Sequence, residues 1–403
     1  MAQHLGLLIL GALAYVILWR EGMLRRNAAL FLSAALLLLA MALRALCMDH
    51  ETLDYQNFLT RWVEFYRENG GFRALGRSVG NYNVPYLCFL ALFSYLPVRD
   101  LYLIKLLSVA FDVLLAWGVL RILQRVTCRE GTALAGFLIT LFLPTVVLNG
   151  AYWGQCDSVY TAFGVWSLAF ALEHKPLRAM ASAALAFAFK LQAVFLLPVF
   201  LLFLFSGHIR WRHLPVFPLT YLLAVLPAVL AGRPMWHTLT LYFHQAGSVG
   251  GGLNYNSPSV YAFLPYGAQV DEALLARLGI AAAFVFLLLL YLLCFSRRKR
   301  LDDRTLLLCA VLICIAVPYL LPHMHDRYFF PADVLSAALA LALPWSLPAA
   351  LCVSFASFLG YYAYLNMRYL LPMRYGAWAL LGAIALLLLL LSLSLSGKLK
   401  KSG

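Results

Sequence analysis

Charged residues are scarce in this chain of 403 residues: Asp, Glu, Lys and Arg together make up 12% of it, whereas hydrophobic residues make up 64%. Soluble domains usually contain about 25% charged residues. A water-soluble globule is therefore excluded, and the lipid bilayer is the expected solvent. Apolar runs of about 20 residues recur from Leu5 to Leu395, and a run of that length crosses the hydrocarbon layer as a helix.

Several motifs of common enzymes are also missing. The sequence contains no GxxxxGK[ST] loop, no Rossmann glycine fingerprint, no DxD triplet, no HExxH and no CxxC pair. It therefore offers no site for ATP or nucleotide-sugar chemistry, and the eight cysteines are expected to be free thiols. The net charge of +14 comes from short clusters between apolar runs, so membrane topology explains it and nucleic acid is not an expected partner.

These basic clusters predict the orientation of the chain, because Lys and Arg remain on the cytoplasmic side. The clusters are Arg20/Arg25/Arg26, Arg121/Arg125/Arg129, Lys175/Arg178, Arg210/Arg212, Arg297 to Arg300 and Lys398/Lys400/Lys401. Thirteen membrane helices then place every cluster in the cytoplasm, with the N-terminus outside and the C-terminus inside. These helices are expected at 4–19, 28–46, 101–123, 131–149, 155–172, 179–189, 193–206, 213–231, 276–295, 304–321, 329–347, 349–365 and 375–396.

The predicted fold is an all-α integral membrane bundle with a long, partly helical first outer loop (47–100) and a second long outer loop (232–275). An extra N-terminal transmembrane helix and cytoplasmic turn (1–27) precede the main transmembrane domain (28–365), and a last helix with a basic tail (366–403) follows it. The first apolar run has the length of a signal peptide, but no small-residue cleavage site follows, so we expect this helix to be retained. The segment 84–96 is expected in or partly across the outer interface.

Asp54, in the first outer loop, is the strongest candidate for a catalytic base. Phe58, Trp62 and Phe65 form an apolar stripe at helical spacing that would hold Asp54 near the bilayer. A partly desolvated carboxylate is a better base than a solvated one. The alternative is an ordinary solvated loop charge.

Polar residues also interrupt later apolar segments. Asp157 follows Trp153 and Gln155 at an outer helix boundary, where it is either functional or a helix cap. Lys190 interrupts the run 179–206, which costs free energy unless the lysine pairs or an anionic ligand compensates it. The segment 322–331 holds His323, His325 and Arg327; anion recognition is favoured there over a metal site, because zinc would need further ligands.

These residues suit one type of reaction. If a sugar is joined through phosphate to a membrane lipid, the leaving phosphate requires cations rather than a general acid. One base on the opposite face of the sugar then suffices. Asp54 is the expected base, and Lys190, Arg327, His325 and His323 are expected at the phosphate. The candidates for substrate contact are Tyr55, Tyr82, Tyr86, Trp153, Gln155 and Asp157.

Five short segments carry a resemblance to a known superfamily: Leu53 to Tyr55, Gly80 to Tyr86, Gly154 to Ser158, Phe189 to Gln192 and His323 to Tyr328. With them, the chain resembles the GT-C superfamily of polyprenyl-phosphate-sugar-dependent glycosyltransferases over roughly residues 28–365. The most similar members are bacterial enzymes related to the mannosyltransferases of GPI-anchor synthesis and to the dolichyl-phosphate-glucose glucosyltransferases of the endoplasmic reticulum. The extra N-terminal helix departs from the usual start of such chains.

The resemblance implies an antiparallel helix bundle with Asp54 as the catalytic acidic residue, and with Lys190, His325 and Arg327 at the lipid phosphate. It implies transfer of mannose or glucose to a glycan or glycolipid acceptor at the outer face of a bacterial inner membrane, or in the endoplasmic reticulum of a eukaryote. The first loop lacks the paired acidic residues of protein O-mannosyltransferases, so neither a cofactor nor a metal is expected. A flippase for lipid-linked sugars, an O-antigen-type ligase or polymerase and a non-catalytic scaffold remain alternatives.

Overall fold

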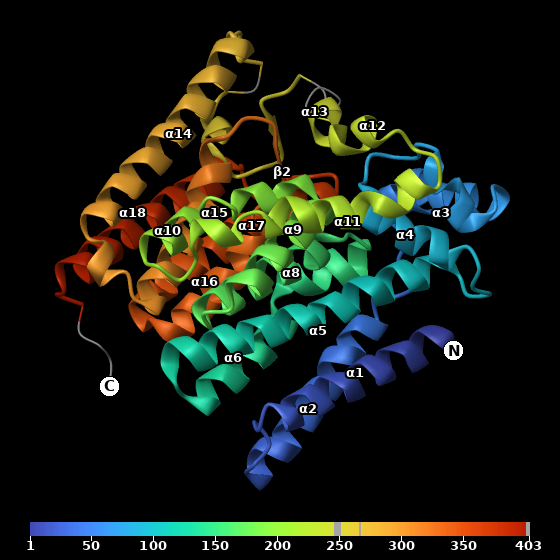
Figure 1. The fold of residues 1–403 in the computed structure, drawn as a ribbon, viewed down its shortest axis with the longest axis horizontal. Helices are drawn as coiled ribbons and strands as arrows, with labels where there is room; N and C mark the ends of the chain where they lie inside the picture. Colours follow the sequence, from blue (N-terminus) through green and yellow to red (C-terminus); the bar gives the residue numbers. More distant parts are fainter. Residues whose placement is uncertain (246–250, 266, 400–403) are drawn as a thin grey trace.

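Helices make up nearly all the regular structure of this protein (Figure 1). The structure is a computed structural model, and it describes residues 1–245, 251–265 and 267–399. Within those residues, the only strands are β1 (Asn254–Tyr255) and β2 (Met324–His325), which pair in parallel. The prediction of an all-α membrane protein is confirmed, because the apolar residues form long helices throughout the chain.

Eight helices in the described part of the chain are long and apolar enough to cross a membrane. They are α1 (Ala2–Arg20), α2 (Asn27–Ala45), α5 (Asp100–Thr127), α11 (Val216–Leu230), α14 (Glu272–Ser296), α15 (Asp303–Leu320), α17 (Leu347–Leu365) and α18 (Arg374–Ser396), where α11 and α17 each count together with a short 3-10 turn before them.

A ninth span results if one bent pair of helices is counted as a single crossing. α6 (Glu130–Phe142) is followed by α7 (Pro144–Val147) and the π-helix η3 (Leu148–Trp153), with a bend of 49° at the break. Leu143 has ψ of 126° because a residue before proline is disfavoured in the helical conformation. The predicted helix 131–149 is therefore two helices.

The remaining helices are shorter. They are α3 (Thr60–Glu68), α4 (Val84–Phe93), α8 (Asp157–Leu172), α9 (Pro176–Phe189), α10 (Val199–Phe205), α12 (Met235–Leu239), α13 (Leu241–Gln245) and α16 (Phe330–Ala342). Each of the thirteen predicted segments contains a helix, but only eight or nine have the length of a span, so the helix count supports no more than that number. The predicted helix 329–347 is too long, because Pro344 ends the regular conformation after Ala342.

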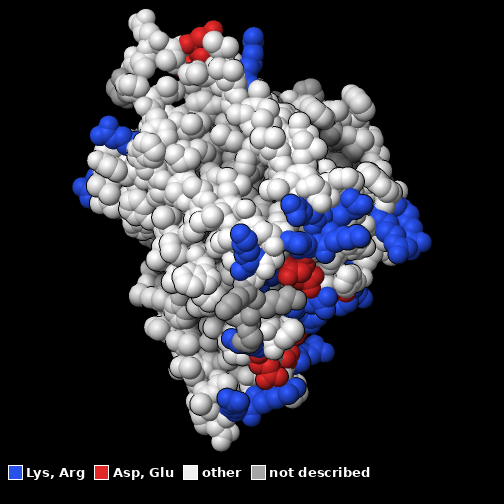
Figure 2. All heavy atoms as spheres, turned by 90° about the vertical axis from the view of Figure 1, so that its left-hand side faces the viewer, with Lys and Arg blue, Asp and Glu red and all other residues white. Residues whose placement is uncertain are grey.

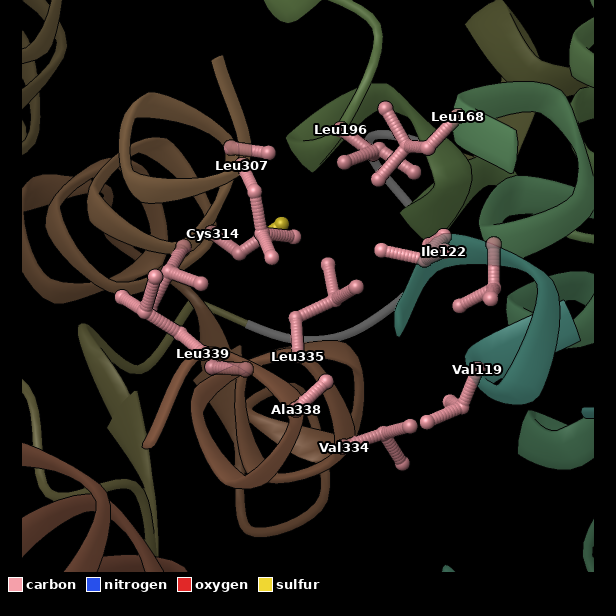
Figure 3. Close-up of a cluster of buried hydrophobic side chains, with 14 of the residues drawn as sticks. Val119, Ile122, Leu168, Leu196, Leu307, Cys314, Val334, Leu335, Ala338 and Leu339 are labelled. Carbon is pink, nitrogen blue, oxygen red and sulfur yellow. The ribbon is translucent and has the colours of Figure 1, made fainter. Parts of the chain in front are cut away.

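The core joins helices that are distant in sequence. α5, α8 and α9 pack side by side, and the alanine-rich α9 approaches α8 closely because its side chains are small. Figure 3 shows the buried side chains where α5 and α8 face α15 and α16. The labelled residues are Val119, Ile122, Leu168, Leu196, Leu307, Cys314, Val334, Leu335, Ala338 and Leu339. The α1–α2 pair lies at the margin of the bundle, where α1 packs on α5 and α2 on α6 (Figure 1).

Ion pairs connect the predicted cytoplasmic clusters at one end of the bundle. Arg125, in the last turn of α5, contacts Asp303 at the start of α15 with 2.8 Å between Nε and Oδ2, and Arg25 pairs with Glu130 at the start of α6. Figure 2 shows Lys and Arg gathered along one side of the face that is on the left of Figure 1, with Asp and Glu between them. At 1.5 Å per residue, the 28 residues of α5 separate this end from the N-terminus of α5 by about 42 Å.

The segment after α2 is partly helical, as predicted. It contains a π-helix (Tyr55–Leu59), α3, a 3-10 helix (Gly71–Gly76) and α4. α4 has ten residues, which is too short for a crossing, and it packs on α3, α9 and α11. This segment positions Asp54 over the N-terminal end of α5, because the Tyr55 hydroxyl donates to Asp100 at 2.9 Å.

Candidate active site

The half-buried carboxylate of Asp54 accepts three hydrogen bonds from distant parts of the chain. Trp153 Nε1 and Gln155 Nε2 donate to Oδ2 at 2.9 Å and 2.6 Å. The Tyr364 hydroxyl, from the end of α17, donates to Oδ1 at 2.7 Å. These bonds hold the carboxylate in one orientation while one side of the residue stays open to solvent.

A tight turn between η3 and α8 brings two of these donors to Asp54. Gly154 has φ of 80°, in the left-handed region that glycine adopts without steric cost. The Ser108 hydroxyl donates to the carbonyl of Gln155 at 2.7 Å, and the Thr52 hydroxyl donates to the carbonyl of Trp153 at 3.1 Å. Because Thr52 lies two residues before Asp54, the second bond ties the acidic segment directly to the turn.

Two cations share one buried carboxylate next to this turn. Lys190 Nζ contacts Asp157 Oδ1 at 2.5 Å, and Arg327 Nε lies 3.3 Å from Asp157 Oδ2. Asn149 Nδ2 also donates to Oδ2 at 2.8 Å. Asp157 is fully buried, so its charge needs these partners, and the three residues together retain one positive charge.

Lys190 reaches this position because the helix breaks there. α9 ends at Phe189, Lys190 is extended with φ −155° and ψ 137°, and a 3-10 turn over Leu191–Phe195 follows. The predicted interruption of the run 179–206 is therefore confirmed. The free energy cost of a lysine within an apolar segment is offset by the Asp157 carboxylate and by the Tyr82 and Tyr160 rings, whose centroids each lie 5.7 Å from Nζ.

The indole of Trp153 contacts both the Asp54 carboxylate and one of the cations. Its Nε1 faces Asp54, and the Arg327 guanidinium lies 5.2 Å from its ring centroid. The Tyr364 ring stacks on it with 4.4 Å between centroids. The fully buried Trp153 ring thus contacts Asp54 through its N–H and Arg327 through its face, and Arg327 shares Asp157 with Lys190.

The sequence of this region matches a known family. The family model of glycosyltransferase family 87 covers residues 81–322, which is more than half of the chain. This chain belongs to glycosyltransferase family 87. No curated protein matches it. The matched region of this glycosyltransferase includes Asp157 and Lys190 and ends one residue before His323, so Asp54 and Arg327 lie outside it. The match assigns no role to single residues, and the roles of all the site residues, inside and outside it, stay predictions.

Two further predicted site residues of the glycosyltransferase, Tyr82 and Tyr86, lie beside these residues and differ in exposure. Tyr82 is half-buried and donates through its hydroxyl to Gln155 Oε1 at 3.2 Å. Tyr86 is buried, and its ring centroid lies 4.7 Å from that of Tyr82. Tyr82 can therefore face a ligand beside Lys190, whereas Tyr86 supports Tyr82 from behind.

The hydrogen bonds of Tyr55 and His323 are to residues other than those around Asp54 and Asp157. The buried Tyr55 hydroxyl is bonded to Asp100. The Nδ1 atom of His323 lies 2.8 Å from the carbonyl of Gly252, and its backbone N–H donates to Leu253 at 2.8 Å. With the pairing of β1 and β2, these bonds join the middle of the second outer loop to the segment that carries His325 and Arg327.

His325 and Asp326 have altered proton affinities. Burial, together with the charges of Arg327 and Lys190, lowers the pKa of His325 to about 4, so this imidazole is neutral at pH 7. It stacks on Tyr255 with 4.7 Å between ring centroids. Burial raises the pKa of Asp326 to about 7, although the adjacent Arg327 opposes this shift. A neutral His325 can donate one hydrogen bond to a phosphate but adds no positive charge.

Sequence reasoning missed several residues of the site. Tyr364 contacts Asp54, and the Tyr361 hydroxyl accepts a hydrogen bond from Asn149 Nδ2 at 2.8 Å. The three-residue spacing of the two tyrosines places them on one face of α17, but tyrosines near the end of a membrane helix are also ordinary interface residues. No signal in the sequence distinguished the two roles.

In the described part of the chain, no group of three or more His, Cys, Asp and Glu side chains is placed to hold a metal ion. The expectation that no metal or other cofactor is needed stays a prediction. The eight cysteines are free thiols, and Cys294 and Cys309 lie with their sulfur atoms 3.9 Å apart.

Proposed function

We propose that this family 87 glycosyltransferase is an inverting enzyme that moves a hexose, mannose or glucose, from a polyprenyl-phosphate donor to an acceptor hydroxyl. The observation that carries the proposal is that Trp153 contacts both the oriented Asp54 carboxylate and Arg327, which shares Asp157 with Lys190. A base and a cationic phosphate site in one region suit attack and departure on opposite faces of one sugar ring.

The hydrogen bonds of Asp54 indicate which oxygen acts. A carboxylate has about four acceptor positions, and Trp153 and Gln155 use both positions on Oδ2. Tyr364 uses one position on Oδ1, so the free position on Oδ1 is available for the acceptor hydroxyl. In the proposed step, Oδ1 takes the hydroxyl proton, the oxygen bonds to the anomeric carbon, and the bond from that carbon to the phosphate oxygen breaks.

The cations suit the leaving group. A sugar phosphodiester carries one negative charge and the departing lipid phosphate gains a second, whereas Asp157, Lys190 and Arg327 retain one positive charge. Attraction therefore increases as the bond breaks, which is the requirement for transition-state stabilisation. In this scheme Asp157 positions both cations, and Tyr82, Trp153 and Gln155 contact the sugar.

The setting that we propose is the outer face of a bacterial inner membrane, with the basic end of the bundle in the cytoplasm and all thirteen helical segments traversing or entering the bilayer. Asp54 lies near the N-terminal end of α5 and the basic clusters lie near its C-terminal end. The acceptor would be a glycan or glycolipid presented from that outer face.

In the experiment, the purified protein in detergent is incubated with radiolabelled polyprenyl-phosphate mannose or polyprenyl-phosphate glucose. A membrane-lipid extract serves as the acceptor. Wild type is compared with Asp54→Asn, Lys190→Met and Glu64→Gln, a control that alters an exposed carboxylate on α3. We expect Asp54→Asn to bind the donor but transfer at least about a hundredfold more slowly. Lys190→Met should bind polyprenyl phosphate more weakly, and the control should resemble wild type.

Each result discriminates between functions. Transfer of label from only one donor would name the sugar. Normal turnover by Asp54→Asn would remove Asp54 from the mechanism, and unchanged phosphate binding by Lys190→Met would leave Lys190 with a purely structural role. Binding of the donor by wild type without any transfer of label would favour a flippase.

A further inference from the structure

Arg233 is a buried arginine without an acidic partner among the residues that the structure describes. It lies in the connection between α11 and α12 and is 3% exposed. Its Nη2 donates to the Ser78 hydroxyl at 2.6 Å, but its buried Nε and Nη1 have no hydrogen-bond partner in the described part of the chain. Those two nitrogens carry three of the five N–H groups of a guanidinium. Buried polar atoms are nearly always paired and a buried charge is costly, so this arginine requires an explanation.

A second buried polar group without a partner lies within electrostatic range of Arg233. Among the described residues, the buried Tyr66 hydroxyl, from α3, has no hydrogen-bond partner. Burial raises the pKa of Tyr66, and the Arg233 cation opposes part of that shift. Burial also lowers the pKa of Arg233. Two buried side chains from separate elements, α3 and the connection after α11, therefore carry donors that the described part of the chain leaves unpaired.

The residues around Arg233 lie at the protein surface. Ser78 is exposed, as are Gly232 and Pro234 on either side of Arg233. The loop that carries Ser78 is tied to the end of α11, because a Cβ atom at Gly76 would lie 2.1 Å from the carbonyl oxygen of Ala231.

The depth of Arg233 in the membrane follows from α11. The candidate span Trp211–Leu230 contains 20 residues, which cover about 30 Å, the thickness of the hydrocarbon layer. Leu230 is 78% exposed at its end, and Trp236 is 77% exposed just beyond Arg233. Exposed tryptophan is typical of the membrane interface. Arg233 thus lies at the depth of the lipid headgroups.

We propose that Arg233 and Tyr66 bind the phosphate of a lipid headgroup. Arg233 supplies the charge and several N–H donors, which suit phosphate oxygens, and the Tyr66 hydroxyl donates one further bond. This site is separate from the cations of the candidate active site, because Lys190 and Arg327 pair with Asp157 whereas Arg233 contacts Ser78. It does not depend on the proposed glycosyl transfer.

The test uses full-length, delipidated protein in a neutral detergent and follows its thermal unfolding midpoint. The probes are dioctanoyl phosphatidylglycerol, dioctanoylglycerol, which lacks the phosphate, and inorganic phosphate. The variants are Arg233→Met, Ser78→Ala and the matched control Arg67→Met, which removes an exposed arginine next to Tyr66.

We expect the phospholipid, but not dioctanoylglycerol, to raise the midpoint of wild type and Arg67→Met. Arg233→Met should need at least about tenfold more phospholipid for the same rise, because it loses charge-assisted hydrogen bonds. Without lipid, Arg233→Met should unfold at the same temperature as wild type or higher, because an unpaired buried charge is gone. Ser78→Ala should bind at least as tightly as wild type.

Two results would overturn the inference. In the first, the phospholipid does not stabilise wild type. In the second, Arg233→Met responds to the phospholipid as strongly as wild type does. An equal effect of inorganic phosphate at the same concentration would reject the lipid as the source of the anion. If Arg233→Met does not fold, Tyr66→Phe replaces it, with a severalfold loss of phospholipid affinity expected and an unchanged affinity counting against the site.

Discussion

Tyr364, at the end of α17, helps to orient the Asp54 carboxylate. Its hydroxyl bonds Oδ1 at 2.7 Å, across 310 positions of sequence, and its ring stacks on Trp153. Removing the hydroxyl leaves the ring in place but gives Oδ1 a second free acceptor position. The carboxylate would then be oriented only through Oδ2.

We therefore predict that Tyr364→Phe lowers kcat by about ten- to a hundredfold, since a hydrogen bond to a charged group contributes roughly 1.5–3 kcal/mol. Donor binding should be unchanged, because the cations are not affected. Steady-state transfer and equilibrium binding of the lipid phosphate measure the two quantities. Tyr362→Phe, which alters a tyrosine that contacts Arg368 instead, is the control; a loss of donor binding in Tyr364→Phe would contradict the prediction.

Asp326 should make stability depend on pH. Burial raises its pKa to about 7 in the folded protein, whereas an unfolded aspartate has a pKa of about 3.9. Between these pH values the folded state keeps a proton that the unfolded state has lost, so stability decreases as pH rises from about 4 to about 7. Asp326→Asn should reduce this decrease, as measured by unfolding midpoints at pH 5 and pH 8. The exposed Asp49→Asn serves as control, and an identical slope in Asp326→Asn would refute the assignment.

At the scale of elements, the junction between α2 and the first outer segment depends on one lysine of α5. Lys105 Nζ donates to the carbonyl oxygens of Cys47, Met48 and His50 at 2.7, 3.3 and 2.6 Å. These carbonyls lie just beyond the end of α2, where helical partners are missing. Lys105 is fully buried and so anchors the segment that leads to Asp54.

Lys105→Met should loosen that segment without unfolding the bundle. We expect faster hydrogen exchange over residues 47–54, a loss of roughly 1–3 kcal/mol in local stability from three unpaired carbonyls, and a lower kcat. Exchange measured by mass spectrometry locates the change. Lys299→Met, at the opposite end of the bundle, should leave exchange there unaltered; protection of 47–54 equal to wild type would show that the lysine is not the anchor.

The helices themselves were largely predictable. The break at Lys190 was visible in the sequence because a charged residue in an apolar run has to leave the lipid. The bend at Pro144 and the end of α16 before Pro344 were missed, although both follow from the restriction that proline places on the preceding residue. The ends of these helices could thus have been predicted from the neighbouring prolines, but the continuous apolar pattern favoured longer helices.

At the scale of the whole molecule, the proposed orientation places Asp54 and the basic clusters on opposite sides of the membrane. Arg67→Cys puts a thiol on the exposed face of α3, and Cys128 is exposed beyond the C-terminus of α5. A membrane-impermeant maleimide should label Arg67→Cys more than wild type in intact spheroplasts. In inverted vesicles, Cys128→Ser should reduce labelling relative to wild type. The reverse pattern would invert the topology.

The sequence by itself determined that lipid is the solvent, where most helices form, and which polar residues are costly within them. These properties depend on runs of neighbouring residues, whose composition and spacing are local. Only the tertiary structure decided that Lys190 and Arg327 share Asp157, that Tyr364 bonds Asp54, and that Tyr55 contacts Asp100. The physical reason is that helix packing brings together side chains tens to hundreds of positions apart, and no periodicity within a single helix specifies which neighbour its polar residues will meet.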